Sequence, residues 1–197
     1  MAKNKGSAKA ESRPGRLRIV AGKWRSRLLP VADAPGLRPT AERVRETLFN
    51  WLANRIADSH CLDLYAGTGA LAFEALSRGA SAVTLVEKSS RVARGLQQSK
   101  GLLEADAATI ECQDAQHFLQ VRPDSPYDIV FLDPPFAEDL LEESCRLLQS
   151  NGWLGRQAVV YLEQDKRQPP FELPAGWQIE KEKIAGNVRY QLINVAD

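Results

Sequence analysis

The stretch Cys61-Leu62-Asp63-Leu64-Tyr65-Ala66-Gly67-Thr68-Gly69-Ala70-Leu71-Ala72 decides the fold. This short apolar run breaks into two glycines and continues into a helix-favouring segment, so it predicts a strand, a tight turn and a helix. Glycines at alternate positions permit a positive φ and let the backbone approach a ligand closely. The free N–H groups of the helix point toward the same space. The stretch therefore predicts a ligand-binding turn at a strand end.

The turn fits two classes of cofactor. Its pattern Gly67-x-Gly69-x-x-Ala72 matches the dinucleotide fingerprint, and the next predicted strand ends in Glu87, where a ribose-binding acid is expected. A nicotinamide or flavin cofactor is therefore one hypothesis. Asp63 favours another, because a carboxylate beside the turn repels a pyrophosphate but attracts the ammonium and sulfonium groups of S-adenosylmethionine.

Strand-like and helix-like segments alternate from Cys61 onward, which predicts an α/β fold with a mostly parallel sheet. Two segments near the end flank Ala185-Gly186-Asn187 and predict an antiparallel hairpin. The predicted strands are 61–64, 82–87, 108–112, 127–133, 158–163, 177–184 and 188–195, and the predicted helices are 71–77, 90–103, 115–121 and 138–148.

Acidic residues lie at the ends of four predicted parallel strands. They are Asp63, Glu87, Asp114 and Asp133. Ligands of open parallel sheets bind outside the carboxyl ends of the strands, so these acids are predicted to outline one pocket. Asp114 is also a good N-cap for the helix that follows it.

The sequence Asp133-Pro134-Pro135-Phe136 follows the apolar run 127–132. The first proline has no N–H and favours an extended Asp133, so the chain leaves the sheet abruptly and leaves carbonyl groups unpaired. These carbonyls and the carboxylate accept hydrogen bonds, and Phe136 offers a flat apolar surface for a nucleobase. A merely rigid turn is the structural alternative.

Charge is unevenly distributed along the chain of 197 residues, whose net charge is +1. Residues 1–45 contain twelve Lys or Arg and three Asp or Glu, whereas the remainder contains fourteen and twenty-two. A basic arm on an acidic body is typical of a protein that binds a polyanion at one end. The first thirteen residues also have the composition of a solvated tail.

Two short strands are predicted near residues 16–20 and 26–31 of this arm. Trp24 lies among Lys23, Arg25 and Arg27, an arrangement that suits base stacking and phosphate contact, although a packing tryptophan is an equal alternative. Arg38, Arg43 and Arg45 lie near the start of a predicted helix with Thr40 as its N-cap. These arginines can bind phosphate or form surface salt bridges.

Cysteine and histidine are sparse and without metal-ligand spacing, which argues against disulfides and a metal site. The chain has no hydrophobic leader and no apolar run long enough to span a membrane. We therefore expect a soluble cytoplasmic protein, and nothing in the sequence requires more than a monomer.

Longer motifs carry a resemblance to a known family. The D-x-x-x-G-x-G turn and the Asp-Pro-Pro-Phe sequence resemble those of class I S-adenosylmethionine methyltransferases that modify exocyclic amines of nucleobases. The blocks 18–25 (RIVAGKWR) and 36–52 (GLRPTAERVRETLFNWL) resemble the RsmD family, the 16S ribosomal RNA (guanine(966)-N(2))-methyltransferases.

This resemblance implies a Rossmann-like seven-stranded sheet with a C-terminal antiparallel hairpin and a small N-terminal β-hairpin. It implies a disordered basic tail (1–15), an RNA-binding β-hairpin (16–37) and a methyltransferase domain (38–197) that acts on 16S rRNA, alone or in an assembling or assembled small subunit. The implied cofactor-binding residues are Thr40, Asp63, Tyr65, Gly67, Gly69, Glu87, Lys88, Asp114 and Ala115. The implied RNA-binding residues are Arg18, Lys23, Trp24, Arg25, Arg27, Arg38, Arg43 and Arg45, and the catalytic ones are Asp133, Pro134 and Phe136.

The chemistry of such a site follows from the amine itself. The lone pair of the exocyclic amine of guanine is delocalised into the ring, so a catalyst must accept hydrogen bonds from both N–H groups. Asp133 and the carbonyl of Pro134 fit this task, and the methyl transfer is then helped mostly by positioning. The base must be unstacked or lie in a loop. Three alternatives stay open: an adenine-N6 methyltransferase of DNA or RNA, an NAD-dependent oxidoreductase, and a noncatalytic RNA-binding module.

Overall fold

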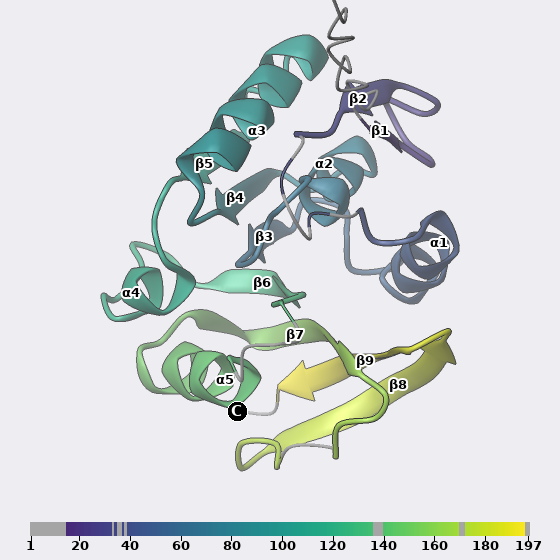
Figure 1. Ribbon diagram of the computed structural model, residues 1–197. Coiled ribbons are helices and arrows are strands. Elements are labelled where there is room, and N and C mark those ends of the chain that lie inside the picture. Colours follow the sequence, from purple (N-terminus) through teal and green to yellow (C-terminus); the bar gives the residue numbers. More distant parts are fainter. Residues whose placement is uncertain are drawn as a thin grey trace, which may run out of the picture.

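The computed structural model describes residues 15–32, 34, 37, 39–135, 140–169 and 172–195. Its centre is a seven-stranded sheet with the strand order β5-β4-β3-β6-β7-β9-β8 (Figure 1). This arrangement confirms the predicted α/β class. The strands are β3 (His60–Asp63), β4 (Ala82–Val86), β5 (Ala108–Glu111), β6 (Tyr127–Leu132), β7 (Leu154–Asp165), β8 (Trp177–Ala185) and β9 (Val188–Val195).

The sheet is parallel from β5 to β7 and antiparallel beyond it. The predicted C-terminal hairpin is confirmed, with Gly186 at a φ of 61° in its turn. Successive strands are added from β3 toward β5, after which the chain returns to the other side of β3 and continues with β6. The reversal lies between β3 and β6, which is where ligands of open α/β sheets bind.

Helices cover both faces of the sheet because the side chains of each buried strand alternate between two cores. Along β6, Ile129 and Phe131 pack in one core, whereas Val130 packs in the other. Helices α1 (Glu42–Trp51), α2 (Ala70–Ser77) and α3 (Ser90–Leu103) contribute to the first core, and α4 (Ala115–Leu119) and α5 (Leu141–Ser150) contribute to the second (Figure 1).

The N-terminal hairpin, β1 (Arg16–Arg18) and β2 (Leu28–Pro30), is fastened to α2. The backbone N–H groups of Val20 and Ala21 donate to the carboxylate of Glu74 at 2.8 and 3.0 Å. Gly22 has a φ of +81°, and a Cβ at this position would lie 1.7 Å from the carbonyl oxygen of Ser77. The hairpin is therefore held against the sheet-covering helix by buried polar contacts and a close backbone approach.

Arg45 is buried in this contact region rather than exposed, with 1% of its surface accessible. Its guanidinium lies 3.2 Å from Glu74, which also accepts from Arg78 at 2.8 Å. The expectation that Arg45 contacts RNA is wrong, because its charge is used to compensate a buried acid that is distant in sequence.

The described residues contain no helix that is both long enough and apolar enough to cross a membrane. The predicted basic tail falls outside the described residues, apart from Gly15.

Candidate active site

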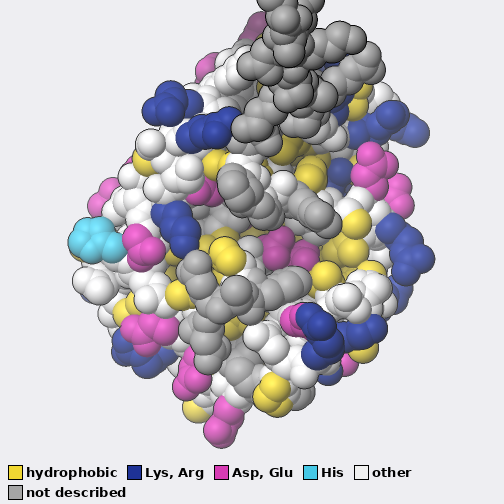
Figure 2. Space-filling model, viewed as in Figure 1, with side chains coloured by type: hydrophobic (Ala, Val, Ile, Leu, Met, Phe, Trp, Pro, Cys, Tyr) yellow, Lys and Arg dark blue, Asp and Glu magenta, His cyan; other side chains and the backbone are white. Residues whose placement is uncertain are grey.

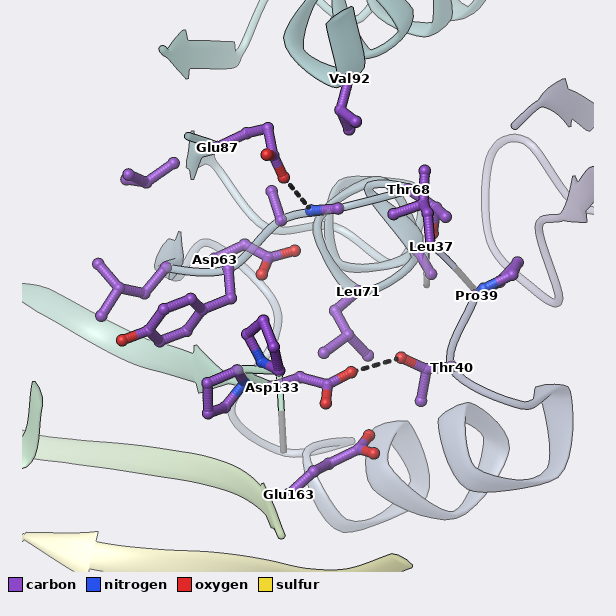
Figure 3. A pocket seen from close by; sticks show the side chains of 18 of the residues that line it. Leu37, Pro39, Thr40, Asp63, Thr68, Leu71, Glu87, Val92, Asp133 and Glu163 are labelled. Atoms are coloured by element: carbon purple, nitrogen blue, oxygen red, sulfur yellow. Dashed lines mark hydrogen bonds between the residues drawn. The ribbon is translucent and has the colours of Figure 1, made fainter. Parts of the chain in front are cut away.

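A cavity of about 1060 Å³ lies at the carboxyl ends of the parallel strands, beside the reversal between β3 and β6. The segment before α1 contributes Leu37, Pro39 and Thr40 to its lining (Figure 3). Figure 2 shows acidic and hydrophobic side chains together near the centre of this face, and both basic and acidic side chains toward its margin. The lining of the cavity is thus rich in acidic side chains.

Asp63 ends β3 and points into the cavity, although only 2% of its surface is exposed (Figure 3). Its Oδ2 accepts a hydrogen bond of 3.2 Å from the N–H of Ala72 in α2. Burial, followed by the charges of Asp133 and Glu87, raises the pKa of Asp63 to about 8, against the opposing effect of the Ala72 bond. A cation bound beside this carboxyl group would restore its charge.

The two glycines of the turn have different tasks. Gly67 lines the cavity, has a φ of +48°, and donates its N–H to Glu87 Oε2 at 3.1 Å. Gly69, with a φ of +74°, is the N-cap of α2, and a Cβ there would lie 2.5 Å from the ring of Phe73. Glu87 also accepts from the N–H of Ser89 at 2.7 Å, so its carboxylate is held at the cavity wall.

Asp133 follows β6 and points into the same cavity (Figure 3). Burial raises its pKa, and the hydroxyl of Thr40, which donates to Asp133 Oδ2 at 3.3 Å, opposes the increase. Thr40 is therefore not the predicted helix cap: the N-cap of α1 is Ala41, and no side chain caps it. Pro134 is buried and lines the cavity, and no backbone donor in the described part of the chain pairs with its carbonyl oxygen.

Glu163 in β7 is a site residue that sequence reasoning missed. It is 4% exposed, lines the cavity and points toward Asp133 (Figure 3). Its Oε1 accepts the hydroxyl of Tyr161 at 2.7 Å. Burial and the charge of Asp133 raise the pKa of Glu163, while the Tyr161 bond lowers it. The available signal was its position near the end of a parallel strand, which it shares with the four predicted acids.

The acids of the cavity destabilise one another's charged forms, as the raised pKa values of Asp63 and Glu163 show. Such a cavity repels phosphate groups and favours a cation. No group of three or more His, Cys, Asp or Glu among the described residues is arranged to hold a metal ion. The acidic lining therefore favours a positively charged ligand.

The lining of the cavity also includes Lys88, Asp114 and Ala115. Asp114 is the N-cap of α4, as predicted, and its Oδ1 accepts from two backbone N–H groups at 2.9 and 3.1 Å. Tyr65 lines the cavity with its hydroxyl 2.7 Å from the Oγ of Ser144 in α5, which holds the tyrosine side chain in place.

Of the predicted RNA-binding residues, only Arg43 is found in the cavity lining of the described structure. Arg25 is exposed on the N-terminal hairpin. Arg38 and Phe136 lie outside the described residues, so their predicted roles stay predictions.

The remaining basic residues of the hairpin lie on its surface. The ammonium of Lys23 is 5.2 Å from the ring centroid of Trp24, which itself packs partly against the core. Arg27 donates to the carbonyl of Leu102 at 2.8 Å, and Arg18 lies 3.8 Å from an acid of α1. The position of Trp24 is thus compatible with both a packing role and base stacking, since its ring packs partly against the core and also lies near the ammonium of Lys23.

Comparisons with known proteins match most of the chain. The family described as "Conserved hypothetical protein 95" matches residues 17–194. Ribosomal RNA small subunit methyltransferase D of Escherichia coli (strain K12) is 48% identical over 178 residues, which are 90% of this chain and 89% of that protein. The protein of the same name from Haemophilus influenzae is 45% identical over 181 residues, 90% of this chain and 93% of its own length.

A solved methyltransferase structure from Escherichia coli is similar to this chain with a TM-score of 0.84 and 47% identity, covering 92% of this chain and 99% of that one. A methylase structure from Haemophilus influenzae has a TM-score of 0.81 and 41% identity, covering 93% and 100%. The similarity therefore includes the N-terminal hairpin as well as the sheet.

Proposed function

We propose that this chain, which belongs to the RsmD family of ribosomal RNA small subunit methyltransferases, transfers a methyl group from S-adenosylmethionine to the N2 amine of guanine 966 in 16S rRNA. One observation carries the proposal. Asp133 shares a cavity with the buried Asp63, and it lies beside the carbonyl of Pro134, which pairs with no backbone donor among the described residues. The cavity thus has acceptors for an amine next to an acid that favours a cation.

The acids support S-adenosylmethionine as the methyl donor. Its ammonium and sulfonium groups carry a positive charge that the buried acids of the cavity attract, and Asp63 and Gly67, which both line the cavity, would meet its methionine part. Glu87 and Asp114 lie along the cavity at the ends of the next two strands, where they would bind the ribose hydroxyls and the adenine amine. A dinucleotide fits less well, because its pyrophosphate would face Asp63.

Asp133 and the carbonyl of Pro134 would accept the two N–H groups of the guanine amine. Both bonds draw electron density toward the nitrogen and orient its lone pair toward the donor methyl group, which moves in an in-line displacement. The methyl carbon would bond to the amine nitrogen as its bond to the sulfur of S-adenosylmethionine breaks, and the extra proton would pass from the nitrogen to water after transfer. Thr40 keeps one oxygen of Asp133 fixed in this arrangement.

The N-terminal hairpin would bring the RNA to the cavity. Arg18, Lys23 and Arg25 are exposed on the hairpin, while Arg43 lies at the cavity itself. We propose that residues 16–37 act as this RNA-binding extension of the methyltransferase domain (38–197), that the substrate is 16S rRNA in an assembling or assembled subunit, and that the protein works as a cytoplasmic monomer.

The reaction can be tested in a strain that lacks this gene. Small-subunit RNA from the strain should lack one N2-methylguanine, which a plasmid carrying the wild-type gene restores and the Asp133→Ala variant does not. Asp124→Asn, an exposed substitution, is the control and should restore the modification. Unchanged N2-methylguanine in the deletion strain would refute the proposal, and loss of N6-methyladenine instead would favour the adenine alternative.

A further inference from the structure

The acid that sequence reasoning missed has a position that relates directly to Asp133. In the register of the parallel strands β6 and β7, Leu132 pairs with Leu162. Asp133 directly follows β6 and Glu163 is the next residue of β7, and neighbouring strands are about 4.8 Å apart, so we expect the two side chains to leave the sheet on the same face. Figure 3 shows both side chains directed into the same part of the cavity.

Glu163 is also held in a fixed orientation. Tyr161 lies two residues earlier on the same face of β7 and donates its hydroxyl to Oε1 at 2.7 Å. Burial and the neighbouring Glu163 raise the pKa of Tyr161 well above its usual value, so the hydroxyl stays a donor. Among the described residues the carboxylate of Glu163 has no other hydrogen bond, so its second oxygen, Oε2, is available to a ligand.

Guanine and adenine differ at the ring position beside the reacting amine. In guanine, N1 next to the N2 amine carries a hydrogen and is a donor. In adenine, N1 next to the N6 amine has a lone pair and is an acceptor. A second carboxylate, next to the group that accepts a hydrogen bond from the amine, would therefore accept the N1–H of guanine but repel the N1 lone pair of adenine. Buried polar groups of this kind discriminate strongly between bases, because the wrong base leaves them without a hydrogen-bond partner.

We propose that Glu163 accepts the N1–H of the target guanine while Asp133 accepts its amine, and that Glu163 thereby selects guanine over adenine. This assignment rests on the proposed function and adds to it the residue that reads the base. A cationic cofactor beside the acids favours the charged form of Glu163, which is the form that accepts this bond.

The test uses RNA in which 2,6-diaminopurine replaces the target guanine. This base keeps the amine at C2 but has an acceptor at N1. The wild-type protein should methylate the diaminopurine RNA with a kcat/KM about 10- to 100-fold below that of the guanine RNA, the value of one hydrogen bond to a charged group. In Glu163→Gln the amide N–H can donate to the N1 acceptor, so most of this difference should disappear.

Two controls separate base reading from other roles. Glu172→Gln, an exposed substitution, should keep the wild-type ratio. Tyr161→Phe, which removes the hydroxyl that fixes Glu163, should lower the rate on guanine without favouring diaminopurine. The dissociation constant of S-adenosylhomocysteine should change by less than about threefold in Glu163→Gln, because the residue contacts the base and not the cofactor.

Several results would overturn the assignment. Equal activity of the wild-type protein on the guanine and the diaminopurine RNA would show that the protein does not recognise the N1–H group. This comparison needs no variant. Equal losses on both RNAs in Glu163→Gln would show a structural role, and a large loss of S-adenosylhomocysteine affinity would place Glu163 at the cofactor. Absence of methylation of the guanine RNA by the wild-type protein would instead refute the proposed function itself.

Discussion

Arg45 and Glu74 form a buried ion pair, and we predict that replacing Glu74 destabilises the protein more than replacing Arg45. Glu74 is fully buried and accepts four groups: Arg45, Arg78 and the N–H groups of Val20 and Ala21. Arg45 has fewer partners, since besides Glu74 its guanidinium donates only to the carbonyl of Thr40 at 3.2 Å among the described residues. Loss of Glu74 therefore leaves more groups unpaired than loss of Arg45.

The expected costs follow from this difference. Glu74→Gln leaves a buried guanidinium without its counter-charge, which costs about 3–5 kcal/mol of the free energy of unfolding. Arg45→Met removes a charge that was itself costly to bury, and Glu74 keeps Arg78 and both N–H donors, so we expect a loss of about 1–2 kcal/mol. For a chain of this size these losses correspond to a fall in Tm of about 10 °C and about 4 °C.

Urea titration of both variants, followed by tryptophan fluorescence, measures the two free energies of unfolding. The double variant should be less destabilised than the two single losses predict together, because the buried guanidinium of Arg45 is no longer present to be left without its counter-charge. RNA affinity of Arg45→Met should stay within about twofold of wild type. The reasoning is refuted if Arg45→Met is as unstable as Glu74→Gln, or if it is stable but no longer binds RNA.

Three further predictions concern the cavity and the hairpin. Because folding raises the pKa of Asp63 to about 8, from about 4 when unfolded, the unliganded protein loses stability as pH rises through this window. Binding of the cofactor should release protons, and its affinity should increase from pH 6 to pH 8. Calorimetry in buffers of different ionisation heat measures the number of protons released, and proton uptake on binding would contradict this prediction. Thr40→Val removes the bond that lowers the pKa of Asp133, so the acid limb of the pH–rate profile should move to higher pH; an unmoved limb would refute this role. Gly22→Ala places a Cβ against Ser77 and should weaken RNA binding about tenfold, while S-adenosylhomocysteine titration stays within about twofold; equal losses of both affinities would contradict a separate RNA-binding role of the hairpin.

The parallel sheet was predictable because its signals are local. The glycine turn marks the end of β3, and the prolines after Asp133 end β6. Strand ends were less accurate, as β7 begins at Leu154 and not near residue 158. The hairpin position of residues 16–30 was also visible in their alternating pattern, but its attachment to α2 was not, since that contact joins residues more than 50 positions apart.

The errors at the site have the same physical origin. The residues around Arg45 resemble the exposed start of a helix. Glu74, which lies far from Arg45 in the sequence, becomes its partner only in the folded protein. Thr40 precedes a helix, as a cap does, but its hydroxyl is directed to Asp133, 93 residues away. Glu163 belongs to the site because it lies beside Asp133. This proximity depends on β7 being the neighbour of β6 in the sheet, and the order of the strands along the chain does not reveal their order in the sheet.

The central claim is methyl transfer to a guanine amine, and the identity of the product nucleoside tests it most directly. Purified protein would be incubated with methyl-labelled S-adenosylmethionine and either protein-free 16S rRNA or assembled small subunits from the deletion strain, followed by digestion and mass spectrometry of the nucleosides. We predict label in N2-methylguanosine, at one site per RNA, with at least one of the two substrates. Label in N6-methyladenosine, or no label with either substrate, would contradict the account.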